Sequence, residues 1–150
     1  MSVLRINRNE SPIEYVRIAN LIYEETYQFL SRVSARYERL IGPGVMTLVD
    51  KLLDNCDFAE VSRGSTTVSK ELRERYLREA LGAVSALDIK MSHLYNIMTQ
   101  NPQGCFTMKN GDTVKPDKAV EKLNKMSQSL GEKIDTEISL IKKVLCDNLQ

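Results

Sequence analysis

The sequence predicts an all-α protein, namely an antiparallel up-down four-helix bundle with a small hairpin-like insert before the last helix. Apolar residues recur at steps of three and four over long stretches, as on one face of an α-helix. Glycine and proline number only 7 and 4 in 150 residues, and they gather at a few breaks. These observations favour a single domain, residues 1–150, with helices at about 12–41, 45–63, 69–100 and 117–148.

The first helix is expected over residues 12–41. Ser11 suits the N-cap, Pro12 suits the first helical position, and Glu14 completes a capping box with Ser11. The apolar face that follows has helical spacing: Ile13, Val16, Tyr23, Tyr27, Leu30, Tyr37 and Ile41. Gly42-Pro43-Gly44 is the strongest break in the sequence, because glycine can end a helix and proline cannot extend one. We therefore expect the first helix to end there.

The second and third helices follow from similar signals. Residues 45–63 present apolar side chains from Val45 to Ala59 on one face and end at a glycine. Ser69 is the expected cap of the third helix, and Asn101-Pro102 stops that helix. The polar loop between Arg63 and Ser69 is short, which favours antiparallel neighbours.

Residues 105–115 interrupt the helical pattern before the fourth helix. Asn110-Gly111 suits a type I′ turn between two short β-prone stretches, so this segment is expected to form a small hairpin. Lys115-Pro116-Asp117 then starts the fourth helix, whose apolar residues recur in near-heptad steps. At 1.5 Å per residue, the three long helices would each span about 45 Å, as neighbours in a bundle should.

Composition argues against several classes of function. The formal net charge is +1, so no overall field attracts nucleic acid or membrane. No apolar run approaches the roughly 18 residues of a membrane span, and no secretory signal is visible. The three cysteines, Cys56, Cys105 and Cys146, have no paired spacing and indicate free thiols in a reducing compartment. We expect a cytoplasmic protein that does not enter a membrane.

Few reactive groups converge in this sequence. His93 is the only histidine, and we expect it at or near the surface rather than in a site. Motifs for zinc hydrolysis, a serine nucleophile, a di-iron centre or a phosphate loop are absent. We also identify no inward-facing carboxylate on the first or fourth helix. The expectation is a non-enzyme with no catalytic residues, no metal site and no cofactor.

Basic residues gather where the third helix begins, and two interpretations remain open. The first is a solvated face with ion pairs at i,i+4 spacing, such as Glu71–Arg75 and Glu74–Arg78. The second is a basic patch that binds backbone phosphates. The candidate nucleic-acid-binding residues of this patch are Arg63, Lys70, Arg73, Arg75 and Arg78.

Other basic residues lie elsewhere in the predicted bundle. Arg32, Arg36 and Arg39 follow one side of the end of the first helix, which an up-down arrangement places opposite the start of the third. Lysines also run along the fourth helix between acidic residues, a pattern typical of a solvated face. These lysines are Lys118, Lys122, Lys125 and Lys133.

The first helix has a second apolar stripe, which is more than one bundle core requires. Its members are Ile18, Ile22, Phe29, Val33 and Leu40, and the first four are the candidate interface. One interpretation is an oligomer interface formed by these four residues. The other is that the first helix is simply the most buried one, or that the fourth helix or the hairpin covers the stripe.

Residues from the first through the third helix resemble a known family of small bacterial four-helix bundles. The resemblance rests on Tyr23–Phe29 (YEETYQF), Arg36-Tyr37, Asn55–Glu60 (NCDFAE) and, above all, Arg75–Leu87 (RYLREALGAVSAL). The family comprises the proteins encoded in 23S rRNA intervening sequences and the accessory variability determinants of diversity-generating retroelements. The last of these segments is similar to the family's third helix, with its Ala-Leu-Gly-small motif.

The resemblance implies a non-enzymatic bundle that assembles into a homopentamer. For the retroelement branch it also implies binding to RNA or DNA and to a reverse transcriptase. Carried over by position, Arg73, Arg75 and Arg78 are its candidates for nucleic-acid contact. The expected function is therefore that of an oligomeric accessory protein that binds nucleic acid. The alternative is a structural or protein-interaction bundle without nucleic-acid binding.

Overall fold

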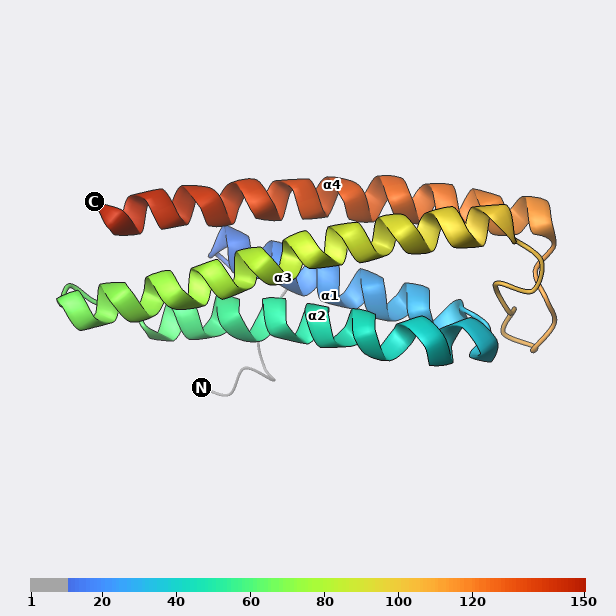
Figure 1. The fold of residues 1–150 in the computed structure, drawn as a ribbon, viewed down its shortest axis with the longest axis horizontal. Helices are drawn as coiled ribbons and strands as arrows, with labels where there is room; N and C mark the ends of the chain where they lie inside the picture. Colours follow the sequence, from blue (N-terminus) through green and yellow to red (C-terminus); the bar gives the residue numbers. More distant parts are fainter. Residues whose placement is uncertain (1–10) are drawn as a thin grey trace.

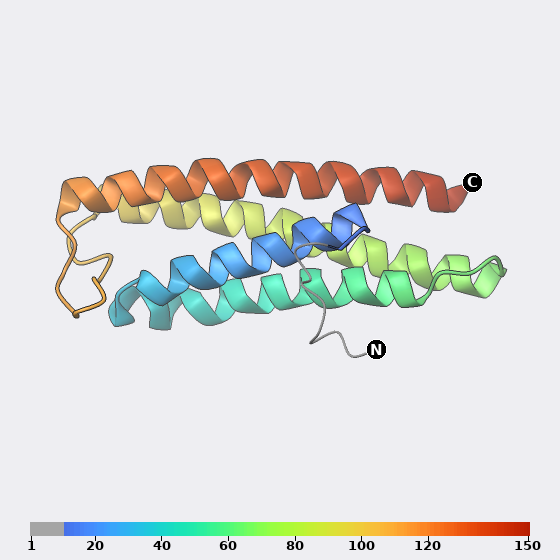
Figure 2. The ribbon, with the colours of Figure 1, turned by 180° about the vertical axis from the view of Figure 1, so that it is seen from behind.

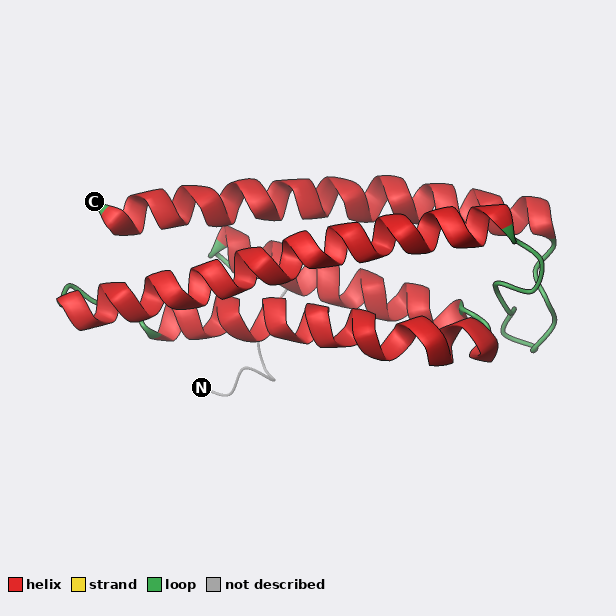
Figure 3. Cartoon of the chain, viewed as in Figure 1, coloured by secondary structure: helices red, strands yellow, loops and turns green. Residues whose placement is uncertain are grey.

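The computed structural model describes residues 11–150, and that part of the chain is four α-helices without a strand (Figures 1 and 3). The helices are α1 (Glu14–Arg32), α2 (Ala35–Val61), α3 (Thr67–Gln100) and α4 (Pro116–Leu149). They lie side by side along the long axis of the molecule, and α1 packs on α2, α2 on α3, α3 on α4 and α4 on α1. The predicted all-α, up-down four-helix bundle is confirmed.

The four helices differ in length, and this shapes the two ends of the bundle. α1 has 19 residues, whereas α3 and α4 have 34 each. Figure 2 shows that α1 lies along the part of the bundle next to the insert and stops short of the end where α3 begins and α4 finishes. Within residues 11–150, α1 therefore contributes to the insert end of the bundle and not to the opposite end.

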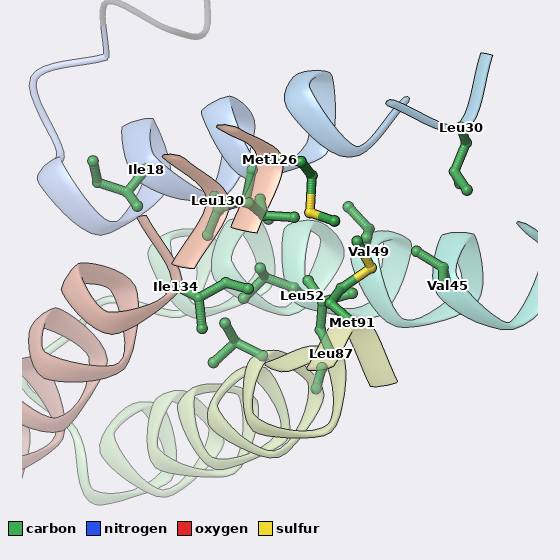
Figure 4. Close-up of a cluster of buried hydrophobic side chains, with 14 of the residues drawn as sticks. Ile18, Leu30, Val45, Val49, Leu52, Leu87, Met91, Met126, Leu130 and Ile134 are labelled. Carbon is green, nitrogen blue, oxygen red and sulfur yellow. The ribbon is translucent and has the colours of Figure 1, made fainter. Parts of the chain in front are cut away.

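The core is aliphatic and draws on every helix. Figure 4 shows Ile18 of α1, Leu52 of α2, Leu87 of α3 and Ile134 of α4 directed toward one another. Alternation of apolar and polar positions at helical spacing produces this arrangement, because each helix has only one face to bury. All four of these side chains are at most 6% exposed.

The break between the first two helices is not where the sequence predicts it. It lies at Val33-Ser34, so the predicted bounds 12–41 and 45–63 are wrong. Val33 is extended and pairs with Phe106 of the insert in an antiparallel bridge. The Ser34 amide donates to the Cys105 carbonyl (2.7 Å), and the Thr107 amide donates to the Arg32 carbonyl (3.0 Å). Docking of the insert, and not a local stop signal, ends α1.

Gly42-Pro43-Gly44 lies inside α2 instead of ending a helix. Pro43 has no amide hydrogen, so α2 lacks the helical bond to the Arg39 carbonyl. The flanking glycines keep helical backbone, since the only described glycines with positive φ are Gly104 and Gly111. Tertiary packing thus outweighs the local cost of proline, which is about 3 kcal/mol in a helix interior.

Two predicted helix caps also differ from the structure. α1 begins after Ile13 without a side-chain cap, and Ser11 Oγ only accepts from the Ile13 amide (3.3 Å), so no capping box forms. α3 is capped by Thr66, whose Oγ1 accepts from the Ser69 amide (3.1 Å). Ser69 is therefore the third residue of the helix and not its cap.

The insert is a hairpin, as predicted, but its turn differs from the predicted type. Thr107 bridges Thr113, and the Met108 amide donates to the Asp112 carbonyl (2.7 Å). The Gly111 amide donates to the Met108 carbonyl (2.9 Å), and Gly111 alone in the loop has positive φ, at 90°. A type I′ turn needs two positive φ values, so this loop has a type I turn followed by a left-handed glycine.

Candidate nucleic-acid interface

The predicted patch at the start of α3 contains one arginine that serves the fold. The side chain of Arg73 is only 11% exposed. Its guanidinium donates to the Ala59 carbonyl (3.2 Å) and to Glu60 (3.0 Å), which also accepts from the buried Tyr15 hydroxyl. Burial, and next the Glu60 carboxylate, raises the pKa of Tyr15. Arg73 thus links α3 to α2 and α1 and is not available to a phosphate.

The other members of the patch are exposed, but acidic residues neutralise much of their charge. Arg78 pairs with Glu74 (2.8 Å), as the solvated-face interpretation expects, and Arg63 pairs with Glu60 (3.5 Å). Lys70 lines a shallow cavity of about 270 Å³ together with Arg63, Arg73, Gly64, Asp147 and Asn148. The structure therefore brings Arg63, Lys70 and Arg73 together and leaves Arg75 and Arg78 along the exposed side of α3.

A more basic site lies at the opposite end of the bundle, where α1 ends and α4 begins. A groove of about 660 Å³ runs between the hairpin and α4, and we call it the basic groove. Its lining residues are Arg32, Thr107, Met108, Lys109, Asp112, Thr113, Val114, Lys115, Lys118 and Lys122. Five of them are cationic and one is acidic, so positive charge dominates.

The sequence positions these cations by two separate means. Lys118 and Lys122 are four residues apart and share one face of α4, and Lys115 is the N-cap that directly precedes this helix. Pro116 at the first helical position fixes where this row begins. Arg32 reaches the groove because the hairpin pairs with the end of α1, and the same hairpin carries Lys109. Convergence thus depends on the docked insert.

The acidic side chains near the basic groove do not cancel its charge. The Asp112 carboxylate accepts from the Asn110 amide within the hairpin loop (3.0 Å). Lys118 pairs with Glu121 at 3.3 Å, so Glu121 offsets one of the five cations, as Glu74 offsets Arg78 in the other patch. The groove therefore presents a net positive surface to an anionic ligand.

The second basic cluster of the sequence extends this surface but is divided by the helix break. Arg32 ends α1, whereas Arg36 and Arg39 are exposed in the first turns of α2. The Arg36 guanidinium lies 5.8 Å from the centre of the Tyr37 ring. Arg36 and Tyr37 line a neighbouring cavity of about 640 Å³, which extends to Pro116.

The residues predicted as an oligomer interface are inside the protomer. Ile18, Ile22 and Val33 are at most 6% exposed, so they cannot form a contact between chains. Phe29 is half-buried and packs edge-on against Phe106 of the hairpin, with ring centres 5.7 Å apart. The alternative is thus correct for this stripe, since neighbouring helices and the hairpin cover the surplus apolar face of α1.

Glu137 is an ionisable core residue that the sequence analysis does not predict. Glu137 of α4 is fully buried, and its carboxyl has no hydrogen-bond partner among the described residues. Burial raises its pKa to about 9, and the charge of Glu14 adds to the effect. The spacing contained the signal, because Glu137 occupies a core position between Ile134 and Ile141. The expectation of no inward carboxylate on the fourth helix is wrong.

Glu137 does not assemble a recognisable catalytic or metal centre. Glu137 interacts electrostatically with Cys56, whose thiol pKa is raised by burial and next by Glu137, so both groups are neutral near pH 7. Within residues 11–150, no group of three or more His, Cys, Asp or Glu could hold a metal ion. His93, the only histidine, is exposed on α3.

No helix within the described part of the chain is both long and apolar enough to cross a bilayer. Comparison of the chain with family models, with curated proteins and with solved structures gave no match. Function must therefore be argued from the geometry of the chain itself.

Proposed function

We propose that this chain is a non-enzymatic helical-bundle protein that binds nucleic acid through the basic groove. The observation that carries the proposal is the convergence of five cationic side chains from α1, the hairpin and α4 around one groove with a single acidic lining residue. Lysine and arginine that neutralise backbone phosphates release counterions, and this release supplies most of non-specific affinity. A near-neutral chain can bind nucleic acid in this way if its cations are locally concentrated.

The patch at the start of α3 is the weaker candidate for the same activity. Arg73 is committed to Glu60 and Ala59, and Arg78 and Arg63 have acidic neighbours. A phosphate would have to compete with those carboxylates for each guanidinium. Lys70 and Arg75 are then its most accessible cations, which is fewer than the basic groove offers.

Assembly and a protein partner form a further part of the proposal, and the family resemblance alone supports them. A homo-oligomer, on that basis a pentamer, would bring several basic grooves together, and a reverse transcriptase would be the expected partner. Any interface must use exposed apolar side chains instead of the buried α1 stripe. The described candidates are Leu40, Val61, Val68, Ile89, Ile97 and Leu149. Light scattering of the purified chain measures the mass, and a monomer would refute the assembly.

A pair of triple variants tests the basic groove against the α3 patch. The groove variant carries Lys115→Gln, Lys118→Gln and Lys122→Gln, all at exposed sites. The matched patch variant carries Lys70→Gln, Arg75→Gln and Arg78→Gln, and it loses the same charge. Binding of a fluorescent nucleic acid is measured by anisotropy from about 50 to about 200 mM salt.

The groove variant should lose most of the affinity, and its salt slope should fall by about 3, that is by about one for each lost phosphate contact. The patch variant should lose much less, although its net charge is identical. Equal losses would show that overall charge, and not the groove, controls binding. Absence of binding by the unmodified chain at about 50 mM salt would refute nucleic-acid binding and favour the protein-interaction alternative.

A further inference from the structure

The lining of the basic groove offers no surface on which an unpaired base could stack. None of the described residues that line it is aromatic. Phe106 of the hairpin is only 2% exposed and packs against Phe29 of α1. Tyr37 in the neighbouring cavity has Arg36 over its ring, and its hydroxyl approaches the Asn101 carbonyl (3.4 Å). Proteins that bind single strands without sequence preference combine a basic groove with aromatic stacking platforms, and the second component is missing here.

Side chains that could read base edges are also scarce in the groove. Asn110 and Asp112 at the hairpin tip are hydrogen-bonded to each other. The Asn110 side-chain amide donates to the Asp112 carboxylate (3.0 Å), and the Asp112 backbone amide donates to the Asn110 side-chain oxygen (3.0 Å). Four of the five cations are lysines, which act as point charges, whereas the commonest specific base contact is a bidentate arginine on guanine. The available groups therefore suit phosphates and not bases.

The α4 wall of the groove is a short row of lysines that begins at the N-cap of one helix. Lys118 and Lys122 are separated by about 6 Å along the helix axis, and Lys115 precedes them as the N-cap. A duplex holds its phosphates in a regular array, about 3.4 Å of axial rise apart on each strand, so lysines spaced along one helix can meet several of them without ordering a flexible nucleic-acid strand. A single strand would lose conformational entropy on the same row and gain no stacking in return.

We infer that the basic groove binds the phosphate backbone of one strand of a double-stranded nucleic acid and does not read its bases. The inference rests on the proposed function and specifies its ligand. Lys109 of the hairpin and Arg32 of α1 line the groove together with the lysines at the start of α4, so the backbone lies between the hairpin and the helix while the base pairs remain outside. Duplex DNA and duplex RNA share this chemistry.

The test compares four fluorescent probes of equal phosphate count with the full chain: duplex DNA, duplex RNA, oligo-dT and oligo-U. Anisotropy titrations at several salt concentrations use the unmodified chain, the groove variant and the patch variant. At least one duplex should bind about tenfold or more tightly than its single-stranded counterpart, with a salt slope of about −4.5 for duplex DNA if all five groove cations contact phosphates. The groove variant should lose this preference for a duplex. Whichever duplex binds more tightly to the unmodified chain shows whether the ligand is DNA or RNA.

Several outcomes separate this inference from the proposed function. Tighter binding of oligo-dT or oligo-U, lost in the groove variant, would overturn the duplex inference and leave the proposed function intact. A duplex preference that survives in the groove variant would overturn the inference by placing the duplex site elsewhere. A difference of more than about tenfold between two duplexes of unrelated sequence would overturn the absence of base reading. No binding of any probe would refute the proposed function itself.

Discussion

Replacement of the buried carboxyl of Glu137 should make the bundle more stable at neutral pH. The pKa of this group is about 9 in the folded protein against an ordinary value of 4.5. At pH 7 the unfolded chain therefore carries an ionised carboxylate, while the folded chain keeps it protonated. Holding that proton costs about 3 kcal/mol of folding stability at pH 7, which is a large fraction of the total for one domain.

The sign of the pH dependence follows from the raised pKa. Below pH 4.5 the carboxyl is protonated in both states, so its ionisation takes nothing from the stability. Stability is then lost as pH rises from about 4.5 to about 9, where the folded group ionises as well. Among residues 11–150, the ionisable groups whose charge couples to Glu137 are Cys56 on α2 and Glu14 on α1, and neither is a cation that could offset the loss.

The assay is urea unfolding followed by circular dichroism at pH 5, 7 and 9. Glu137→Gln and Glu137→Leu should raise the free energy of unfolding at pH 7 by up to about 3 kcal/mol and flatten its decline toward pH 9. Glu132→Gln, an exposed site on the same helix, is the control and should change stability by less than about 0.5 kcal/mol. Parallel pH profiles for the unmodified chain and both Glu137 variants would refute the reasoning, because they would mean that the carboxyl is hydrated or paired.

Two further predictions concern the helices themselves. Pro43→Ala restores the missing amide in α2 and should raise the free energy of unfolding by about 1 to 3 kcal/mol in the same urea assay; a loss of stability would argue that Gly42–Gly44 ends a helix after all. Tyr15→Phe removes the hydroxyl that donates to Glu60 and should cost about 2 kcal/mol, whereas Tyr27→Phe at an exposed site should cost almost nothing. Equal effects of the two tyrosine variants would show that the bond to Glu60 adds no stability.

Local signals located the third and fourth helices well. Their observed bounds, Thr67–Gln100 and Pro116–Leu149, agree with the predicted ones to within two residues. Each has strong apolar periodicity, and Asn101-Pro102 and Pro116 mark where one stops and the other starts. Periodicity of this kind is decided along the chain, so it can be read without knowledge of the neighbours.

The candidate site was harder to predict because its members are distant in sequence. The sequence interpretation considered Arg32 as part of a cluster at the end of the first helix and Lys118 as part of a solvated face. Only the docked hairpin brings them to one groove with Lys109. Conversely, the sequence predicts Arg73 as a phosphate ligand, but packing buries it against Glu60. The sequence alone does not place these two residues side by side.

The sequence by itself determined that this protein is a helical bundle, because apolar spacing and the scarcity of glycine and proline are properties of the chain. Tertiary structure alone decided where the first helix ends. Residues 33 and 34 have no strong stop signal, yet their pairing with the hairpin keeps them extended, while packing keeps Pro43 helical. Hydrogen bonds between distant segments can outweigh local propensities of a few kcal/mol, and here they also position the basic groove.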